Sequence, residues 1–170
     1  YPLDPQVRSD HVHALLVSHE FAAAATAAES AAQLVRPSAP LYLLASRAYL
    51  RLGKADQAQE ALHQALAREG DGHLAALLRG EIALLKGDAP NALAAFDLAL
   101  KTKDSADAHL GRALALALAG QPEAAEAEWA TLPKFSAYEA TEVYERLILL
   151  LDQAWNRVIE RVRQSMASPI

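Results

Sequence analysis

Histidine is the most versatile side chain for metal binding and proton transfer, and this chain of 170 residues contains six. His11 and His13 are two positions apart, which places them on different sides of a helix, and His19 lies two turns beyond His11. A zinc site needs three or four ligands in one place. We therefore expect these histidines to be solvated or packed, and we predict no metal site. The others occur singly, at His63, His73 and His109.

The remaining candidates for chemistry are equally isolated. There is no glycine-rich phosphate loop, and Ser18 and Ser46 have no marked partner that would activate a nucleophile. The chain has no cysteine, which excludes disulfides and thiolate chemistry. Glu123, Glu126 and Glu128 cluster near the start of an expected helix, where negative charge complements the helix dipole. We assign no catalytic residue and no cofactor, and we predict that the chain is not an enzyme.

A regular spacing dominates the rest of the chain. Gly53, Gly87 and Gly120 are 34 and 33 residues apart, and an alanine follows each glycine five residues later. Such a period indicates stacked helix-turn-helix repeats. The same steps outward reach His19 and Gln153, so we expect five units. Their ranges are 5–38, 39–72, 73–106, 106–138 and 139–170.

The residues inside these units follow a pattern of small and aromatic positions. The positions that carry it are Tyr42, Ala45, Gly53 and Ala58; Gly80, Gly87, Ala92 and Phe96; and Ala113, Gly120, Ala125 and Trp129. This pattern resembles the tetratricopeptide repeat family. The resemblance implies an all-α fold, a right-handed superhelical solenoid of about five repeats, or about ten helices, in a single domain over residues 1–170. It also implies that this fold binds other proteins.

The repeat pattern also leads to expectations for individual residues. The repeat alanines Ala58, Ala92 and Ala125 are expected to be buried where paired helices cross. Arg79 and Arg112 stand where the family usually has leucine, so we expect their charges to reach water along the helix surface. The alternation of alanine and leucine from Ala113 to Ala119 is locally typical of a strand. Both residue types are weak strand markers, so we predict a helix there.

Composition limits the class of protein. The net charge of −5 and the isoelectric point near 5.7 argue against a general nucleic-acid binder. No apolar run reaches the length of a membrane span, so we expect a soluble protein. Its alanine, leucine and arginine usage is typical of a bacterial source, with the cytoplasm or periplasm as its compartment. Because the chain begins at Tyr1, we expect it to be processed or to be a piece of a longer protein.

The resemblance also implies where a partner binds. In this family the first helix of each hairpin lines a concave face. The corresponding residues here are Leu43, Arg47, Leu50, Arg51, Leu77, Glu81, Leu84, Leu110, Leu114 and Leu147. This set predicts a mostly aliphatic groove with a small charged collar, which suits an apolar peptide or amphipathic helix from another protein. Two alternatives stay open: self-association through the same face into a homo-oligomer, and burial of these leucines within the chain.

Overall fold

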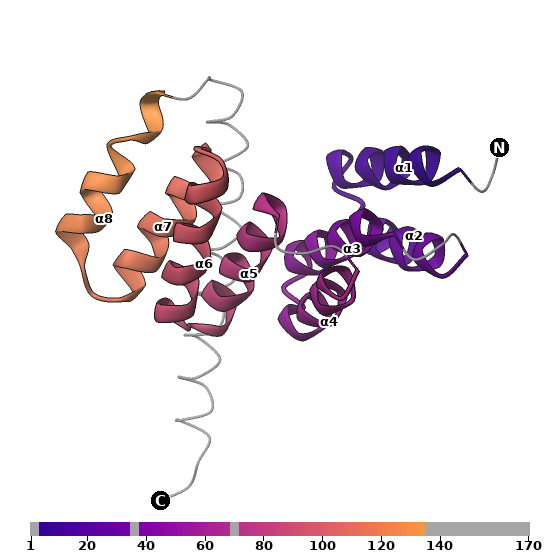
Figure 1. The fold of residues 1–170 in the computed structure, drawn as a ribbon, viewed down its shortest axis with the longest axis horizontal. Helices are drawn as coiled ribbons and strands as arrows, with labels where there is room; N and C mark the ends of the chain where they lie inside the picture. Colours follow the sequence, from indigo (N-terminus) through magenta and orange to yellow (C-terminus); the bar gives the residue numbers. More distant parts are fainter. Residues whose placement is uncertain (1–3, 35–37, 69–71, 135–170) are drawn as a thin grey trace, which may run out of the picture.

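A computed structural model describes residues 4–34, 38–68 and 72–134 of the chain. Within these ranges it contains eight α-helices, one short 3-10 helix and no strand, which confirms the predicted all-α fold (Figure 1). None of the described helices is both long and apolar enough to cross a membrane. The helices are α1 (Pro5–Val17), α2 (Phe21–Leu34), α3 (Ala39–Arg51), α4 (Ala55–Leu66), α5 (His73–Lys86), α6 (Ala89–Thr102), α7 (Ala106–Leu118) and α8 (Pro122–Trp129), followed by η1 (Leu132–Lys134).

Consecutive helices pair as hairpins, α1 with α2, α3 with α4, α5 with α6 and α7 with α8. Each hairpin falls inside one of the units expected from the spacing, and the stretch from Ala113 is the second half of α7. The fifth expected unit, residues 139–170, lies outside the described residues. Helices and their order therefore agree with the repeat spacing throughout the described residues.

The turns inside the hairpins explain why glycine recurs with this period. Gly53, Gly87 and Gly120 have φ angles of 71°, 76° and 75°, in the left-handed region that glycine enters without a steric penalty. His19, which occupies the same place in the first unit, has a φ of 60°. It is the only residue other than glycine with a positive φ in the described part of the chain. The left-handed turn is thus kept even where the glycine is missing.

Helix starts follow ordinary capping rules. The side chain of Asp88 accepts a hydrogen bond from the backbone N–H of Asn91 at the start of α6, at 3.2 Å. Ser105 accepts one from Ala108 at the start of α7. Pro90 and Pro122 lie in the first turns of α6 and α8, where their missing N–H groups have no partner in the helix. These residues therefore mark the starts of α6, α7 and α8.

Small residues at the helix crossings allow the close packing. Ala58 and Ala92 are completely buried, as predicted. Ala125 is only half-buried, so the prediction is wrong for this position. The reason is that α8 contains no buried residue among those described. Apolar packing therefore weakens towards the end of the described array.

Phe96 of α6 is the largest completely buried side chain in the described structure. Its ring fills the space where two glycines face α6. A Cβ atom at Gly80 of α5 would lie 2.6 Å from Phe96 Cζ, and one at Gly111 of α7 would lie 2.2 Å from Phe96 Cε1. Both distances are far below van der Waals contact. The two glycines therefore make room for one aromatic ring that joins three helices.

Two buried polar groups also join helices. The hydroxyl of Ser46, which is completely buried, donates to the Ala58 carbonyl oxygen at 2.8 Å and so connects α3 to α4. The Tyr49 hydroxyl donates to Glu29 Oε1 at 2.6 Å and connects α3 to α2. Burial raises the pKa of Tyr49 to about 12, and the hydrogen bond and negative charge of Glu29 add to this effect. Neither polar group is left without a partner, as buried polar groups require.

The first prediction concerns the space around Phe96. We expect Gly111→Ala to lower the free energy of unfolding by about 1–3 kcal/mol, because the added methyl overlaps the ring. Alanine is normally favoured over glycine inside a helix by about 0.5–1 kcal/mol, so a loss would isolate the overlap. Chemical denaturation measures the change. Gly72→Ala, at the N-cap of α5, controls for an added methyl without overlap, since nothing lies within 4 Å of its added Cβ. Equal stability of the wild type and Gly111→Ala would contradict this packing.

The second prediction concerns Tyr49. Its pKa is near 12 in the folded chain and the ordinary value is 10, so the folded state holds the hydroxyl proton more tightly. The stabilisation is fully present below pH 10 and is lost as the pH rises towards 12. Absorbance titration of tyrosinate, taken as the difference between the wild type and Tyr49→Phe, should show one group with a pKa near 12. A difference curve centred at 10 would contradict the buried hydrogen bond.

Candidate interaction surface

The first helices of neighbouring hairpins form one side of the molecule. α1 packs against α3, α3 against α5, and α5 against α7. The second helices do not pack closely against one another in this way. The hairpins are therefore closer together along their first helices, and these helices line an inner face. The predicted binding residues in the described ranges all belong to these first helices.

Three of the predicted contact residues are buried, so they cannot line an open groove, and for them the alternative of burial within the chain holds. Leu50, Leu77 and Leu110 have exposed fractions of 5%, 4% and 3%. Leu50 belongs to the apolar core shared by the first five helices, and Leu77 to the cluster around Phe96. Leu110 packs in a small cluster with Ala106 and Leu132. The physical reason is that packing between neighbouring helices covers Leu50 and Leu77, and η1 covers Leu110.

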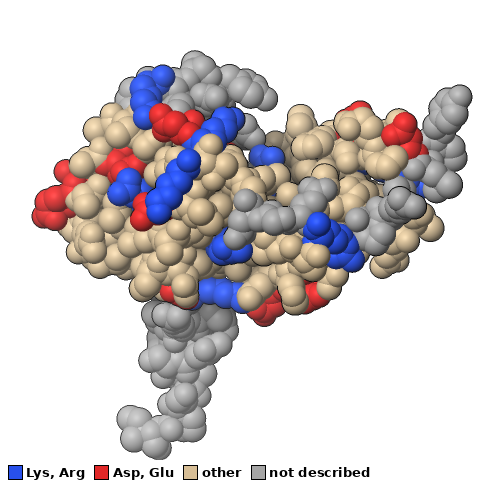
Figure 2. Space-filling model, viewed as in Figure 1, with Lys and Arg blue, Asp and Glu red and all other residues tan. Residues whose placement is uncertain are grey.

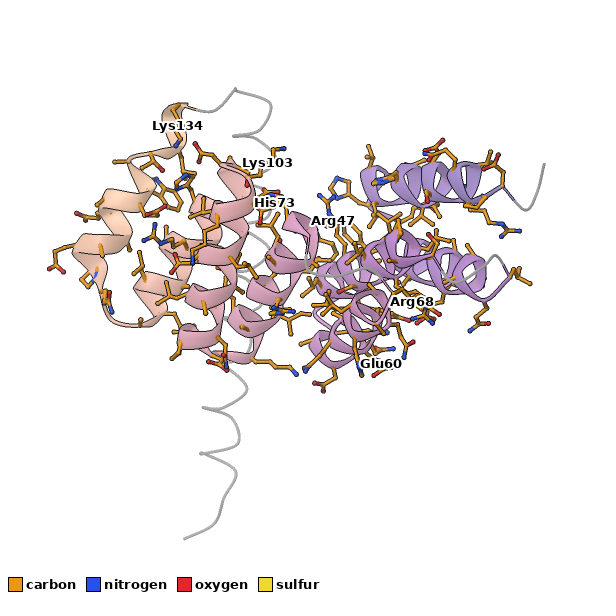
Figure 3. The ribbon with its side chains drawn as sticks, viewed as in Figure 1. Arg47, Glu60, Arg68, His73, Lys103 and Lys134 are labelled. Carbon is orange, nitrogen blue, oxygen red and sulfur yellow. The ribbon has the colours of Figure 1, made fainter. Side chains whose placement is uncertain are left out.

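The other predicted residues remain partly accessible. Leu43, Leu84 and Leu114 are half-buried, one in each of α3, α5 and α7. The charged residues Arg47, Arg51 and Glu81 are also half-buried, and each already takes part in a polar or electrostatic interaction. Figure 3 shows Arg47 on α3 beside the start of α5. Leu147 lies outside the described residues.

A polar network at α7 and α8 escaped the sequence analysis. Arg112 Nε lies 3.0 Å from Asp97 Oδ1 of α6, and Arg112 Nη1 lies 3.0 Å from Glu128 Oε2 of α8. Glu128 also contacts the His109 ring at Nδ1, and its side chain is 11% exposed. Arg112 therefore pairs with two carboxylates, and its charge is not simply solvated as expected. Glu128 has a specific partner in α7 beyond its effect on the helix dipole.

The network continues to the end of the described chain. His109 Nε2 lies 2.6 Å from Asp104 Oδ1, and Lys134 Nζ lies 3.0 Å from Asp104 Oδ2. The hydrogen bonds from Lys134 and then from His109 lower the pKa of Asp104. The stabilisation that follows is present above the ordinary carboxyl pKa and is lost as the pH falls below it. Since both ring nitrogens of His109 face carboxylates, this histidine positions helices.

The accessible charges on the rest of the surface are mixed. Figure 2 shows lysine and arginine side chains interspersed with aspartate and glutamate over the visible face. No group of three or more histidine, aspartate or glutamate side chains that could hold a metal ion occurs in residues 4–34, 38–68 and 72–134.

Comparison with known families supports this interpretation. A family model described as tetratricopeptide repeat matches residues 43–106, from within α3 to the start of α7. Residues 43–106 belong to the tetratricopeptide repeat family. Tetratricopeptide repeats generally mediate protein–protein interaction and are typically non-catalytic. No curated protein sequence matches the chain at a significant level.

The third prediction concerns the polar network that joins α8 to α7. We expect Glu128→Gln to destabilise the docking of α8 by about 1–3 kcal/mol, because Arg112 and His109 lose a charged partner in a nearly buried position. Hydrogen exchange of the α8 amides measures this local opening. Glu126→Gln is the matched control, since Glu126 is an exposed carboxylate of the same helix. Equal exchange in both variants would show that the network does not hold α8.

Proposed function

We propose that this chain is a protein-interaction module, which acts as an adaptor, scaffold or chaperone-like holder and takes an apolar peptide or helix on its inner face. The observation that carries the proposal is the continuous contact of α1, α3, α5 and α7, which forms one face from several repeats. The membership of residues 43–106 in a protein-interaction family supports it. A larger bacterial assembly, such as a secretion or envelope system, is the setting that the composition favours.

The contact residues of this proposal are those that remain accessible. Leu43, Leu84 and Leu114 supply partly exposed aliphatic side chains along the inner face. Arg47, Arg51 and Glu81 supply charges of both signs beside them. Buried leucines such as Leu77 support the inner face by packing beneath it, and we do not propose them as direct contacts. Because aliphatic contacts carry most of the area, we expect salt to weaken partner binding only slightly.

The fourth prediction tests the inner face with a photo-crosslinking amino acid at two positions. At Arg47 of α3 it should form an adduct with a partner protein in extracts of the native organism. At Glu60, an exposed residue of α4, it should form none. Figure 3 shows both labelled positions, on different helices of the same hairpin. Thermal melts of the two variants control for folding, and mass spectrometry identifies the adduct.

Each outcome of this experiment has a distinct meaning. An adduct at twice the mass of the chain at position 47 would favour self-association through the inner face. This alternative also predicts a mass that rises with concentration in light scattering. Adducts at position 60 together with none at 47 would contradict the inner-face proposal.

A further inference from the structure

A second surface lies on the opposite side of the hairpins. Since the first helices are in contact and the second helices are not, a gap opens between α4 and α6, with α5 as its floor. The structure has a cleft of about 730 Å³ there. This volume is typical of binding clefts, which span roughly 300–1,000 Å³. The cleft is separate from the inner face on which the proposed function depends.

Each of the three helices lines the cleft with one of its faces. The lining residues of α4 and of α5 follow the spacing i, i+3, i+4 and i+7, which is the spacing of one helix face. These residues are Gln59, Leu62, His63 and Leu66 in α4, and Arg79, Ile82, Ala83 and Lys86 in α5. From α6 the cleft takes Asn91, Ala94, Ala95, Leu98 and Lys101, with Asp88 at its start. Three helices thus form a trough with straight sides.

The bottom of this trough is apolar. Leu62, Ile82 and Ala95 are exposed by 5% or less and close its base. Leu66 and Leu98 are half-buried and stand higher on the two walls. The walls are helices of 12 and 14 residues, so their length is about 20 Å. A helix of three to four turns fits a trough of this length and lays one apolar stripe on its floor.

Positive charge dominates the described lining. The lining contains three cationic side chains, Arg79, Lys86 and Lys101, and one carboxylate, Asp88, although the whole chain has a net charge of −5. Asp88 is already engaged as the cap of α6, where it accepts from Asn91 Nδ2 at 2.6 Å. Lys86 lies 3.0 Å from Asp56. The lining therefore has the opposite sign to the molecule that carries it.

The charge is also uneven along the cleft. Lys86 contacts Gln59, so the end of α5 and the start of α4 lie together at one end, beside Asp88. Leu66 is seven residues after Gln59 in α4, and Arg79 is seven residues before Lys86 in α5, so both lie towards the other end of the cleft, where Lys101 is near the end of α6. No described carboxylate lines this second end. Lys101 is exposed and makes no ion pair among the described residues.

We propose that this outer cleft binds an amphipathic helix of a partner protein, with an aliphatic stripe on the floor and glutamate or aspartate side chains at the end near Arg79 and Lys101. The apolar floor of the cleft supplies the contact area, and the lysine and arginine side chains favour a partner helix with negative charge. An acidic helix is repelled by the acidic molecule as a whole and attracted at this cleft, which favours one docking position and one orientation.

The fifth prediction uses two synthetic 18-residue helical peptides as probes, with the same leucine stripe and either glutamate or lysine at the flanking positions. Fluorescence polarisation with the full chain should show binding of the glutamate peptide and not of the lysine peptide. Lys101→Glu should weaken the binding of the glutamate peptide by about fivefold to tenfold, because an attractive pair becomes repulsive. Lys103→Glu is the matched control, since Lys103 is an exposed lysine two residues away that does not line the cleft (Figure 3).

A second variant separates shape from charge. Ala94 is exposed and lines the cleft, so Ala94→Arg fills the trough without removing a buried side chain and adds a positive charge. If the floor receives an aliphatic stripe, this variant should lose peptide binding despite its added charge. Equal binding of both peptides, or unchanged binding by Lys101→Glu and Ala94→Arg, would overturn the proposal. So would a homodimer that Ala94→Arg dissociates, since the occupant would then be a second copy. Crosslinking at Arg47 tests the inner face independently.

Discussion

The packing of Phe96 between Gly80 and Gly111 is the constraint on which the centre of the described array depends. The ring occupies the volume that a Cβ atom at either glycine would need. α5 and α7 can therefore approach α6 only as long as both positions lack a side chain. The same approach brings α5 and α7 into contact with each other. One aromatic ring and two glycines thus set the spacing of consecutive hairpins, and through it the inner face.

The interactions that hold the helices together differ between the two ends of the described array. In the first units, alanines and leucines from five helices form one apolar core, and polar contacts such as that of Tyr49 are added to it. At α8 no side chain is buried, and the helix is held by the partial packing of Trp129 and by the contacts of Glu128 with Arg112 and His109. Ion pairs near the surface contribute less than apolar burial and depend on pH and salt. We therefore expect the α8 end of the described array to open before its centre.

Sequence spacing was sufficient to predict the helices and their turns, because glycines at left-handed turns leave a mark that does not depend on tertiary contacts. Even His19, which is not glycine, was located by the spacing alone. The sequence was less successful in predicting which leucines of each helix are buried and which are exposed. Leu50 and Leu84 occupy the same position in two consecutive units, 34 residues apart, yet Leu50 is buried and Leu84 is half-buried. Which leucine is covered depends on the distance between neighbouring hairpins, and that distance follows from contacts such as the one at Phe96.

The polar network and the outer cleft could not be predicted for a related reason. His109 and Glu128 are 19 residues apart, and no local pattern links them. The lining of the cleft comes from three helices whose separation no local pattern shows. α5 contributes to both surfaces: Glu81 and Leu84 lie on the stripe predicted for the inner face, whereas Arg79, Ile82 and Lys86 line the outer cleft. Because a single helix separates the two surfaces, a small rotation of α5 moves side chains in both.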